Sequence, residues 1–133
     1  MIRSYARPHT ITVPEMLAPI LPEMEAVEAF LVAQSETNIP EFTALTRHLL
    51  SAGGKRLRPA MVILCAYSAA PERFGALYRN GHAGVERLAR IAGCMEMIHM
   101  ATLVHDDVID QTFTRRGKPT ANALYGNLAT VLS

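Results

Sequence analysis

Residues 96–118 read Glu-Met-Ile-His-Met-Ala-Thr-Leu-Val-His-Asp-Asp-Val-Ile-Asp-Gln-Thr-Phe-Thr-Arg-Arg-Gly-Lys, an apolar run that ends in three aspartates and is followed at once by cations. On an α-helix, which turns by about 100° per residue, Asp106 and Asp110 share a face because they are four positions apart. His99 lies about two turns before Asp106 on the same line, and Asp107 falls to the side. The stretch therefore predicts a helix that carries a carboxylate pair at its end.

The carboxylate pair has two interpretations. Like charges one turn apart repel unless a cation joins them, and Mg²⁺ usually takes one or two carboxylates together with substrate phosphate. Arg115 and Arg116 could then hold phosphate oxygens through their planar donor forks. Alternatively, the helix ends in a solvated acidic turn whose charges Arg115, Arg116 and Lys118 balance. Spacing alone leaves both the metal-bound anion site and the ion-paired helix end open.

A second basic segment lies at residues 53–59 and reads Gly-Gly-Lys-Arg-Leu-Arg-Pro. Glycine lets the backbone come close to a ligand, and the N-terminus of the helix that follows favours an anion. Taken alone this is a weak indication, because basic loops are commonly just solvated. Together with residues 106–116 it predicts two phosphate sites, one assisted by a metal and one formed directly by cations.

The composition narrows the class of protein. Of 133 residues, 50% are apolar and 19% are charged, which suits one small globular domain. The net charge of +1 gives no general attraction to nucleic acid or to an anionic membrane. Neither a signal peptide nor a membrane-spanning run is evident, so we expect a cytoplasmic protein. Cys65 and Cys94 lie in apolar runs and are expected to be buried and reduced.

Apolar spacings of three and four residues predict an all-α fold, a helical bundle. After a flexible arm at residues 1–11, we expect helices at residues 12–34, 40–51, 60–70, 82–110 and from Pro119 onward. Pro22 should kink or split the first helix. The inner face of the long helix at residues 82–110 is predicted to comprise Val85, Leu88, Ile91, Ala92, Met95, Ile98 and His99. The domain is expected to span residues 12–133 and to be truncated within its last helix.

Four segments together resemble the trans-isoprenyl diphosphate synthases, also called polyprenyl synthetases. They are residues 53–59, Glu96-x-x-His99, His105-Asp106-Asp107-Val108-Ile109-Asp110 and Arg115-Arg116-Gly117-Lys118-Pro119-Thr120. They follow the family's order at about its spacing, and this combination is specific. The resemblance covers about residues 13–133, the N-terminal part of a family member. It implies a helical bundle of the isoprenoid synthase type, here incomplete.

The resemblance also implies an activity, in which isopentenyl diphosphate is condensed with an allylic diphosphate to give a polyprenyl diphosphate. Asp106 and Asp110 would hold Mg²⁺ on the allylic diphosphate, and Asp107 would support them in catalysis. Arg115 would contact the allylic diphosphate. The residues that would hold isopentenyl diphosphate are Lys55, Arg58, His99 and Arg116. Family members of this kind form homodimers, so a homodimer is implied as well.

Product length can be inferred from the same resemblance. In this family the product grows down a tunnel that starts below the first aspartates. Short-chain members often block the tunnel with an aromatic residue four or five positions before the motif. Ala101 and Thr102 occupy those positions here and are small. The resemblance therefore implies an open tunnel and a long-chain product.

The family also carries a second aspartate-rich motif on a later helix, which has no counterpart in these 133 residues. We therefore expect the chain to be a fragment of a synthase that is inactive alone. The alternative is a non-catalytic partner subunit of a heteromeric polyprenyl diphosphate synthase. Such subunits usually lack the first aspartate motif, which this chain retains.

Overall fold

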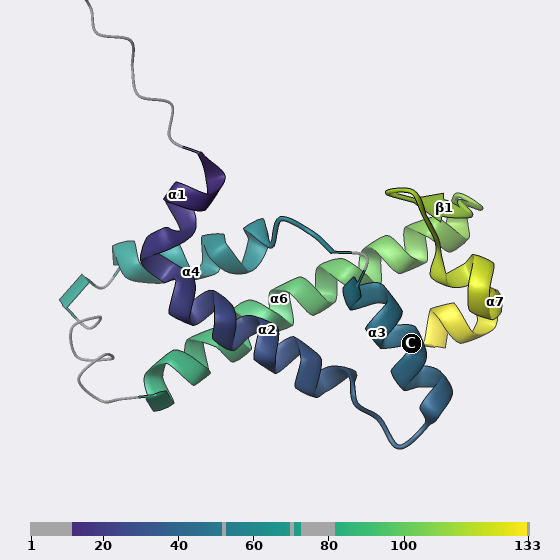
Figure 1. Ribbon diagram of the computed structural model, residues 1–133, viewed down its shortest axis with the longest axis horizontal. Helices are drawn as coiled ribbons and strands as arrows, with labels where there is room; N and C mark the ends of the chain where they lie inside the picture. Colours follow the sequence, from purple (N-terminus) through teal and green to yellow (C-terminus); the bar gives the residue numbers. More distant parts are fainter. Residues whose placement is uncertain (1–11, 52, 70, 73–81, 133) are drawn as a thin grey trace, which may run out of the picture.

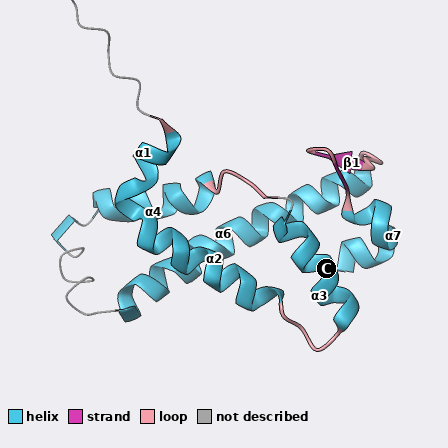
Figure 2. Ribbon diagram, in the orientation of Figure 1, coloured by secondary structure: helices cyan, strands magenta, loops and turns pink. Residues whose placement is uncertain are grey.

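The computed structural model describes residues 12–51, 53–69, 71–72 and 82–132. The helices are α1 (Val13–Leu17), the 3₁₀-helix η1 (Ala18–Ile20), α2 (Leu21–Ser35), α3 (Pro40–Ser51), α4 (Leu57–Ala69), α6 (His82–Ile109) and α7 (Ala121–Leu132). Two short antiparallel strands, β1 (Thr114–Arg115) and β2 (Lys118–Pro119), form a hairpin between α6 and α7. The all-α prediction is confirmed (Figure 2). The arm predicted for residues 1–11 lies outside the described residues.

Helix α6 is the axis of the molecule. Its 28 residues extend for about 42 Å, and it packs against α2, α4 and α7 (Figure 1). The hairpin and α7 lie at its C-terminal end, and α3 packs against α7 there. This end of the bundle therefore brings residues 96–119 close to the loop that follows α3.

The hydrophobic core lies between α2, α4 and α6. Its buried members are Ile20, Val27, Leu31, Ala60, Ile63, Ala89 and Ala92. Helix α6 contributes only the small side chains of Ala89 and Ala92 to these buried members, so α2 can approach α6 closely. At Gly93 the ring of Phe30 lies too close to leave room for a β-carbon. Glycine at this position is therefore explained by helix packing.

The inner face predicted for α6 is wrong at three positions, because Ile91, Met95 and Ile98 are exposed. The buried positions are Ala89, Ala92, Gly93, Glu96, Val104 and Asp107, which recur at helical spacing along one face of α6. They form a different stripe, composed at its N-terminal half of small residues. Hydrophobicity alone could not identify this stripe, because α6 has two apolar faces and the bulkier one is uncovered.

Three smaller expectations also change. Cys65 and Cys94 are exposed and free, since each lies on the outer side of its helix. The first predicted helix is split, as expected, but at η1, which leaves Pro22 in the first turn of α2, where its missing N–H costs little. Pro119 belongs to β2, and the last helix begins at Ala121.

Among the described residues, the structure contains no helix that is long and apolar enough to cross a membrane.

Candidate functional site

A cavity of about 520 Å³ opens between the loop after α3, the middle of α6 and the hairpin. It is lined by five cationic side chains, Lys55, Arg56, Arg58, Arg115 and Arg116, and by only two carboxylates, those of Glu96 and Asp107. His99 also faces it. The cavity thus gathers all five residues that the sequence analysis assigned to diphosphate binding, from segments about 60 positions apart.

The loop at residues 53–56 owes its shape to two left-handed residues. Gly53 has φ +68°, and its N–H donates to Leu50 O at 3.2 Å, which closes the C-terminus of α3. Arg56 has φ +47°, and its carbonyl accepts the N–H of Ala60 at 3.2 Å, which starts α4. Lys55 and Arg58 are exposed on either side of this turn. The loop therefore presents two cations at a helix N-terminus, a favourable position for an anion.

Arg56 differs from its neighbours because its side chain is only 12% exposed. Its Nε donates to Glu28 Oε1 at 2.7 Å, and its Nη1 donates to Glu96 Oε1 at 3.1 Å. Burial opposes the charge, but the hydrogen bonds to both carboxylates outweigh it and raise the pKa of Arg56 above its ordinary value. The sequence predicts no separate role for Arg56, because no spacing signal links residues 28, 56 and 96.

Asp107 pairs with Arg115 at the mouth of the cavity. Arg115 Nε lies 3.0 and 3.1 Å from Asp107 Oδ1 and Oδ2, and its Nη2 lies 2.7 Å from Oδ1. The Asp107 side chain is 9% exposed and that of Arg115 is 40% exposed. The hydrogen bonds to Asp107 outweigh desolvation, and with the nearby charges of Asp107, Asp106 and Asp110 they raise the pKa of Arg115. Asp107 therefore orients the guanidinium of Arg115.

Asp106 and Asp110 are exposed at the end of α6, outside the lining of the cavity. The N–H of Asp110 donates to Asp106 O at 2.8 Å, which confirms that the two residues are one helical turn apart. Within the described part of the chain, neither carboxylate has a side-chain hydrogen bond or an ion pair. Arg115 pairs directly with Asp107 and also feels the charges of Asp106 and Asp110, so the structure is compatible with both the solvated acidic turn and the metal-bound anion site.

The carboxylate pair fits Mg²⁺. No group of three or more His, Cys, Asp or Glu side chains among the described residues could hold a metal by itself. Mg²⁺ needs no such cage, because it keeps several waters and completes its shell with substrate phosphate. Two exposed, unpaired carboxylates on one turn supply the donors that this binding mode requires.

The hairpin is fastened to the end of α3 by three side-chain contacts. Arg116 Nη1 donates to Gly53 O, Lys118 Nζ donates to Ser51 O at 2.7 Å, and His48 Nε2 lies 2.9 Å from Pro119 O. Arg116 was predicted to bind a diphosphate, and its anchoring to Gly53 O places it beside the loop at residues 53–56. These contacts join the two basic segments into one site.

Comparisons with known proteins agree with this geometry. The model of the family described as polyprenyl synthetase matches residues 39–133. The chain is 36% identical over 118 residues to an all-trans-nonaprenyl-diphosphate synthase (geranyl-diphosphate specific) of Rhodobacter capsulatus, covering 89% of this chain and 33% of that protein. It is 40% identical over 110 residues to the octaprenyl diphosphate synthase of Escherichia coli, covering 83% and 30% respectively.

A solved structure shares the fold as well. The polyprenyl synthase of Caulobacter crescentus, complexed with calcium and isoprenyl diphosphate, superposes with a TM-score of 0.73 at 31% identity, covering 94% of this chain and 35% of that one. The helices described above are therefore those of the isoprenoid synthase fold. The chain spans about a third of the length of the relatives it matches. On the family match and these similarities, the chain belongs to the polyprenyl synthetase family.

Proposed function

We propose that the protein is a polyprenyl diphosphate synthase, which joins isopentenyl diphosphate to an allylic diphosphate. The observation that carries the proposal is the cavity in which five cationic side chains from two distant segments meet. A diphosphate is a compact, highly charged anion, and clustered cations with planar donor forks suit it. The bound calcium and isoprenyl diphosphate of the similar Caulobacter protein support the same chemistry.

The two substrates would use different parts of the site. Isopentenyl diphosphate would be held by Lys55, Arg58, His99 and Arg116, which line the cavity. The allylic diphosphate would lie toward Asp106 and Asp110, with Arg115 between the two groups. Because Asp107 occupies Nε and Nη2 of Arg115, the Nη1 group stays available for a phosphate oxygen. Asp107 would therefore support catalysis through Arg115.

Asp106 and Asp110 are the residues that would hold Mg²⁺. When bound, Mg²⁺ would neutralise negative charge on the diphosphate. Their exposure leaves room for water and phosphate in the remaining coordination positions.

The reaction would proceed by loss of pyrophosphate. The bond between the allylic carbon and the diphosphate oxygen breaks, and both electrons leave with the oxygen. The double bond of isopentenyl diphosphate then forms the new carbon–carbon bond, and a proton is lost from the adjacent carbon. The chain's own contribution is to hold the two diphosphates in register and to place Arg115 where negative charge develops.

A long-chain product is supported by the residues before the aspartates. Ala101 and Thr102 are both exposed and small, so they present no aromatic barrier on that side of α6. The nonaprenyl and octaprenyl synthases among the relatives agree. Replacing Ala101 with Phe is expected to shorten the product, as measured by chromatography of the dephosphorylated prenols. An unchanged chain length would show that growth does not pass Ala101.

We also propose a homodimer in the cytoplasm. Exposed large apolar side chains on α6 and α7, among them Ile98 and Leu128, offer a face for a second copy. Exposed free thiols at Cys65 and Cys94 suit a reducing compartment.

Because this chain is expected to be a fragment that is inactive alone, the proposal is tested in the whole synthase, by elongation of labelled isopentenyl diphosphate in the presence of an allylic diphosphate and Mg²⁺. Asp106→Asn and Asp110→Asn are each expected to lower turnover about 10²–10³-fold, the loss typical of one preorganised electrostatic contact. Glu36→Gln, which alters an exposed carboxylate outside the lining of the cavity, should leave turnover unchanged. Elongation that is indifferent to both aspartate variants would instead favour the non-catalytic partner subunit.

A further inference from the structure

Arg56 stands between Lys55 and Arg58, yet its environment is opposite to theirs. Lys55 and Arg58 are exposed, and within the described residues neither has an ion pair, whereas the Arg56 side chain is 12% exposed and doubly paired. Its backbone is in the left-handed region, at φ +47°, which side chains other than glycine, Asn and Asp rarely adopt. A strained, buried cation in a loop requires partners that hold it there.

Those partners lie on two different helices. Glu28 is on α2 and Glu96 is on α6, and the Glu96 side chain is itself only 7% exposed. The three guanidinium nitrogens are all engaged, Nε and Nη2 with Glu28 and Nη1 with Glu96. Glu96 precedes His99 by one turn of α6. The network therefore connects the loop that carries Lys55 and Arg58 directly to the turn that carries His99.

We propose that Arg56 is a positioning residue, which fixes Lys55, Arg58 and His99 in one arrangement without itself binding the diphosphate. The proposal rests on the proposed function of the cavity. Arg56 suits this task because its planar fork bonds two carboxylates at once, which the single ammonium group of a lysine does not reproduce. Its committed nitrogens leave Lys55 and Arg58 as the exposed donors.

Calorimetric titration with isopentenyl diphosphate tests the proposal, with helicity and the melting temperature measured in parallel. Arg56→Lys and Arg56→Gln are each expected to weaken binding tenfold or more. The double variant Arg56→Gln/Glu96→Gln should regain part of the affinity over Arg56→Gln, because it removes the uncompensated buried charge of Glu96. Arg47→Lys is the matched control, since Arg47 forms a similar fork with Glu36 on the surface. It should bind as the wild type does.

The possible results distinguish a failure of the role proposed for Arg56 from a failure of the function proposed for the cavity. If the wild type binds and Arg56→Lys binds equally well, Arg56 positions nothing and the proposal is overturned, although the function of the cavity stands. If the double variant binds no better than Arg56→Gln, the loss in Arg56→Gln does not come from the uncompensated charge of Glu96, and Arg56 acts as a direct ligand, which also overturns the proposal. A wild type that does not bind isopentenyl diphosphate overturns the proposed function and this inference together. Should Arg56→Gln fail to fold, Glu96→Gln must weaken binding on its own for the proposal to stand.

Discussion

The pair of Asp107 and Arg115 gives a stability prediction that can be worked from the structure. Three nitrogen–oxygen distances between 2.7 and 3.1 Å join the guanidinium to both carboxylate oxygens. Hydrogen bonds to a charged group contribute about 1.5–3 kcal/mol to folding. Because the Arg115 side chain is 40% exposed, solvent screens the pair, and we place its coupling in the lower part of that range, at about 1.5–2 kcal/mol.

The same coupling energy predicts a shift in melting temperature. An unfolding entropy of about 2.1 cal/mol/K per residue, taken over 133 residues, amounts to about 280 cal/mol/K. A loss of about 2 kcal/mol should therefore lower the melting temperature by about 7 °C. Asp107→Asn is the suitable perturbation, because it keeps the shape of the side chain and removes its charge.

A double-mutant cycle in urea isolates the interaction. The cycle combines Asp107→Asn with Arg115→Gln, and a matched cycle combines Glu36→Gln with Arg47→Gln on the exposed surface. We expect a coupling of about 1.5–2 kcal/mol for the first pair and about 0.5 kcal/mol or less for the second. Equal coupling energies in the two cycles would refute the reasoning, because burial of Asp107 would then add nothing.

Three further predictions concern single positions. Gly93→Ala should lower the free energy of unfolding by about 1–3 kcal/mol despite alanine's better helix propensity, because the new methyl group meets the ring of Phe30. Phe30→Leu should relieve this loss, and a Gly93→Ala variant more stable than the wild type would contradict the packing of Phe30 on Gly93. Gly117→Ala should cost about 1–2 kcal/mol from backbone strain at φ +76°, with Asn tolerated better, whereas equal losses would show another cause. Hydrogen bonds from the backbone and side chain of Thr12 lower the pKa of Glu15, so the ionised Glu15 stabilises the fold above its unfolded pKa and loses this effect as pH falls through its folded pKa. The fall in the free energy of unfolding at acid pH should therefore be less steep in Glu15→Gln, and it should remain unchanged if the contact is absent in solution.

Much of the fold could be predicted from local signals. Pro40 and Ser51 bound α3 where the sequence places them, and α6 ends at Ile109, one residue before the predicted limit. These boundaries follow from proline at a helix start and glycine after a helix end, which depend on neighbouring residues only. The proximity of the two basic segments was also expected, because both resemble motifs of the same family.

The rest depended on tertiary contacts that no local pattern encodes. Ile91 and Ile98 are as apolar as any core residue, yet they are exposed because α2 and α4 cover the other face of α6. The role of Arg56 depends on carboxylates 28 and 40 positions away. The sequence likewise placed Asp107 to the side of the metal pair, and only the structure shows that it orients Arg115.

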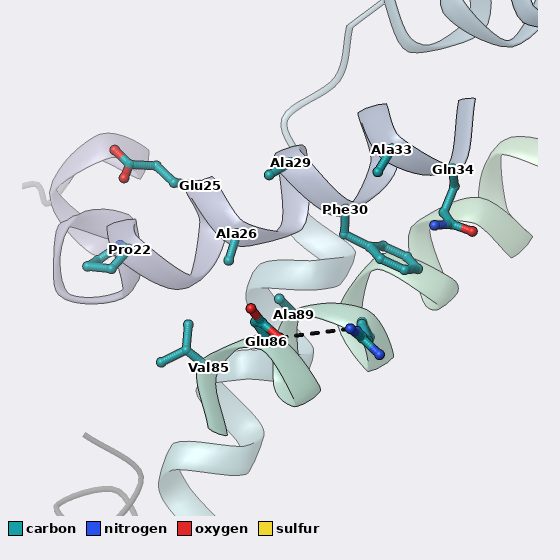
Figure 3. A pocket seen from close by; sticks show the side chains of 11 residues that line it. Pro22, Glu25, Ala26, Ala29, Phe30, Ala33, Gln34, Val85, Glu86 and Ala89 are labelled. Carbon is teal, nitrogen blue, oxygen red and sulfur yellow. Dashed lines mark ion pairs between the residues drawn. The ribbon is translucent and has the colours of Figure 1, made fainter. Parts of the chain in front are cut away.

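A second hollow remains between α2 and the first turns of α6 (Figure 3). Its floor is apolar, with Ala26, Ala29 and Phe30 on α2 facing Ala89 on α6, and Glu86 pairs with Arg90 at its edge. This hollow lies near the opposite end of α6 from the cationic cavity. Substitutions there should therefore affect stability without affecting diphosphate binding.

The central claim is that the protein has two diphosphate sites, of which only one needs a metal. Calorimetric titration of the wild type with each substrate, with and without Mg²⁺, tests it most directly. Isopentenyl diphosphate should bind without Mg²⁺ and lose about tenfold in affinity in Lys55→Ala, while an allylic diphosphate should require Mg²⁺ and the carboxylates of Asp106 and Asp110. If both substrates need Mg²⁺, or if neither loses affinity in these variants, the division of the site into a cationic half and a metal-assisted half is wrong.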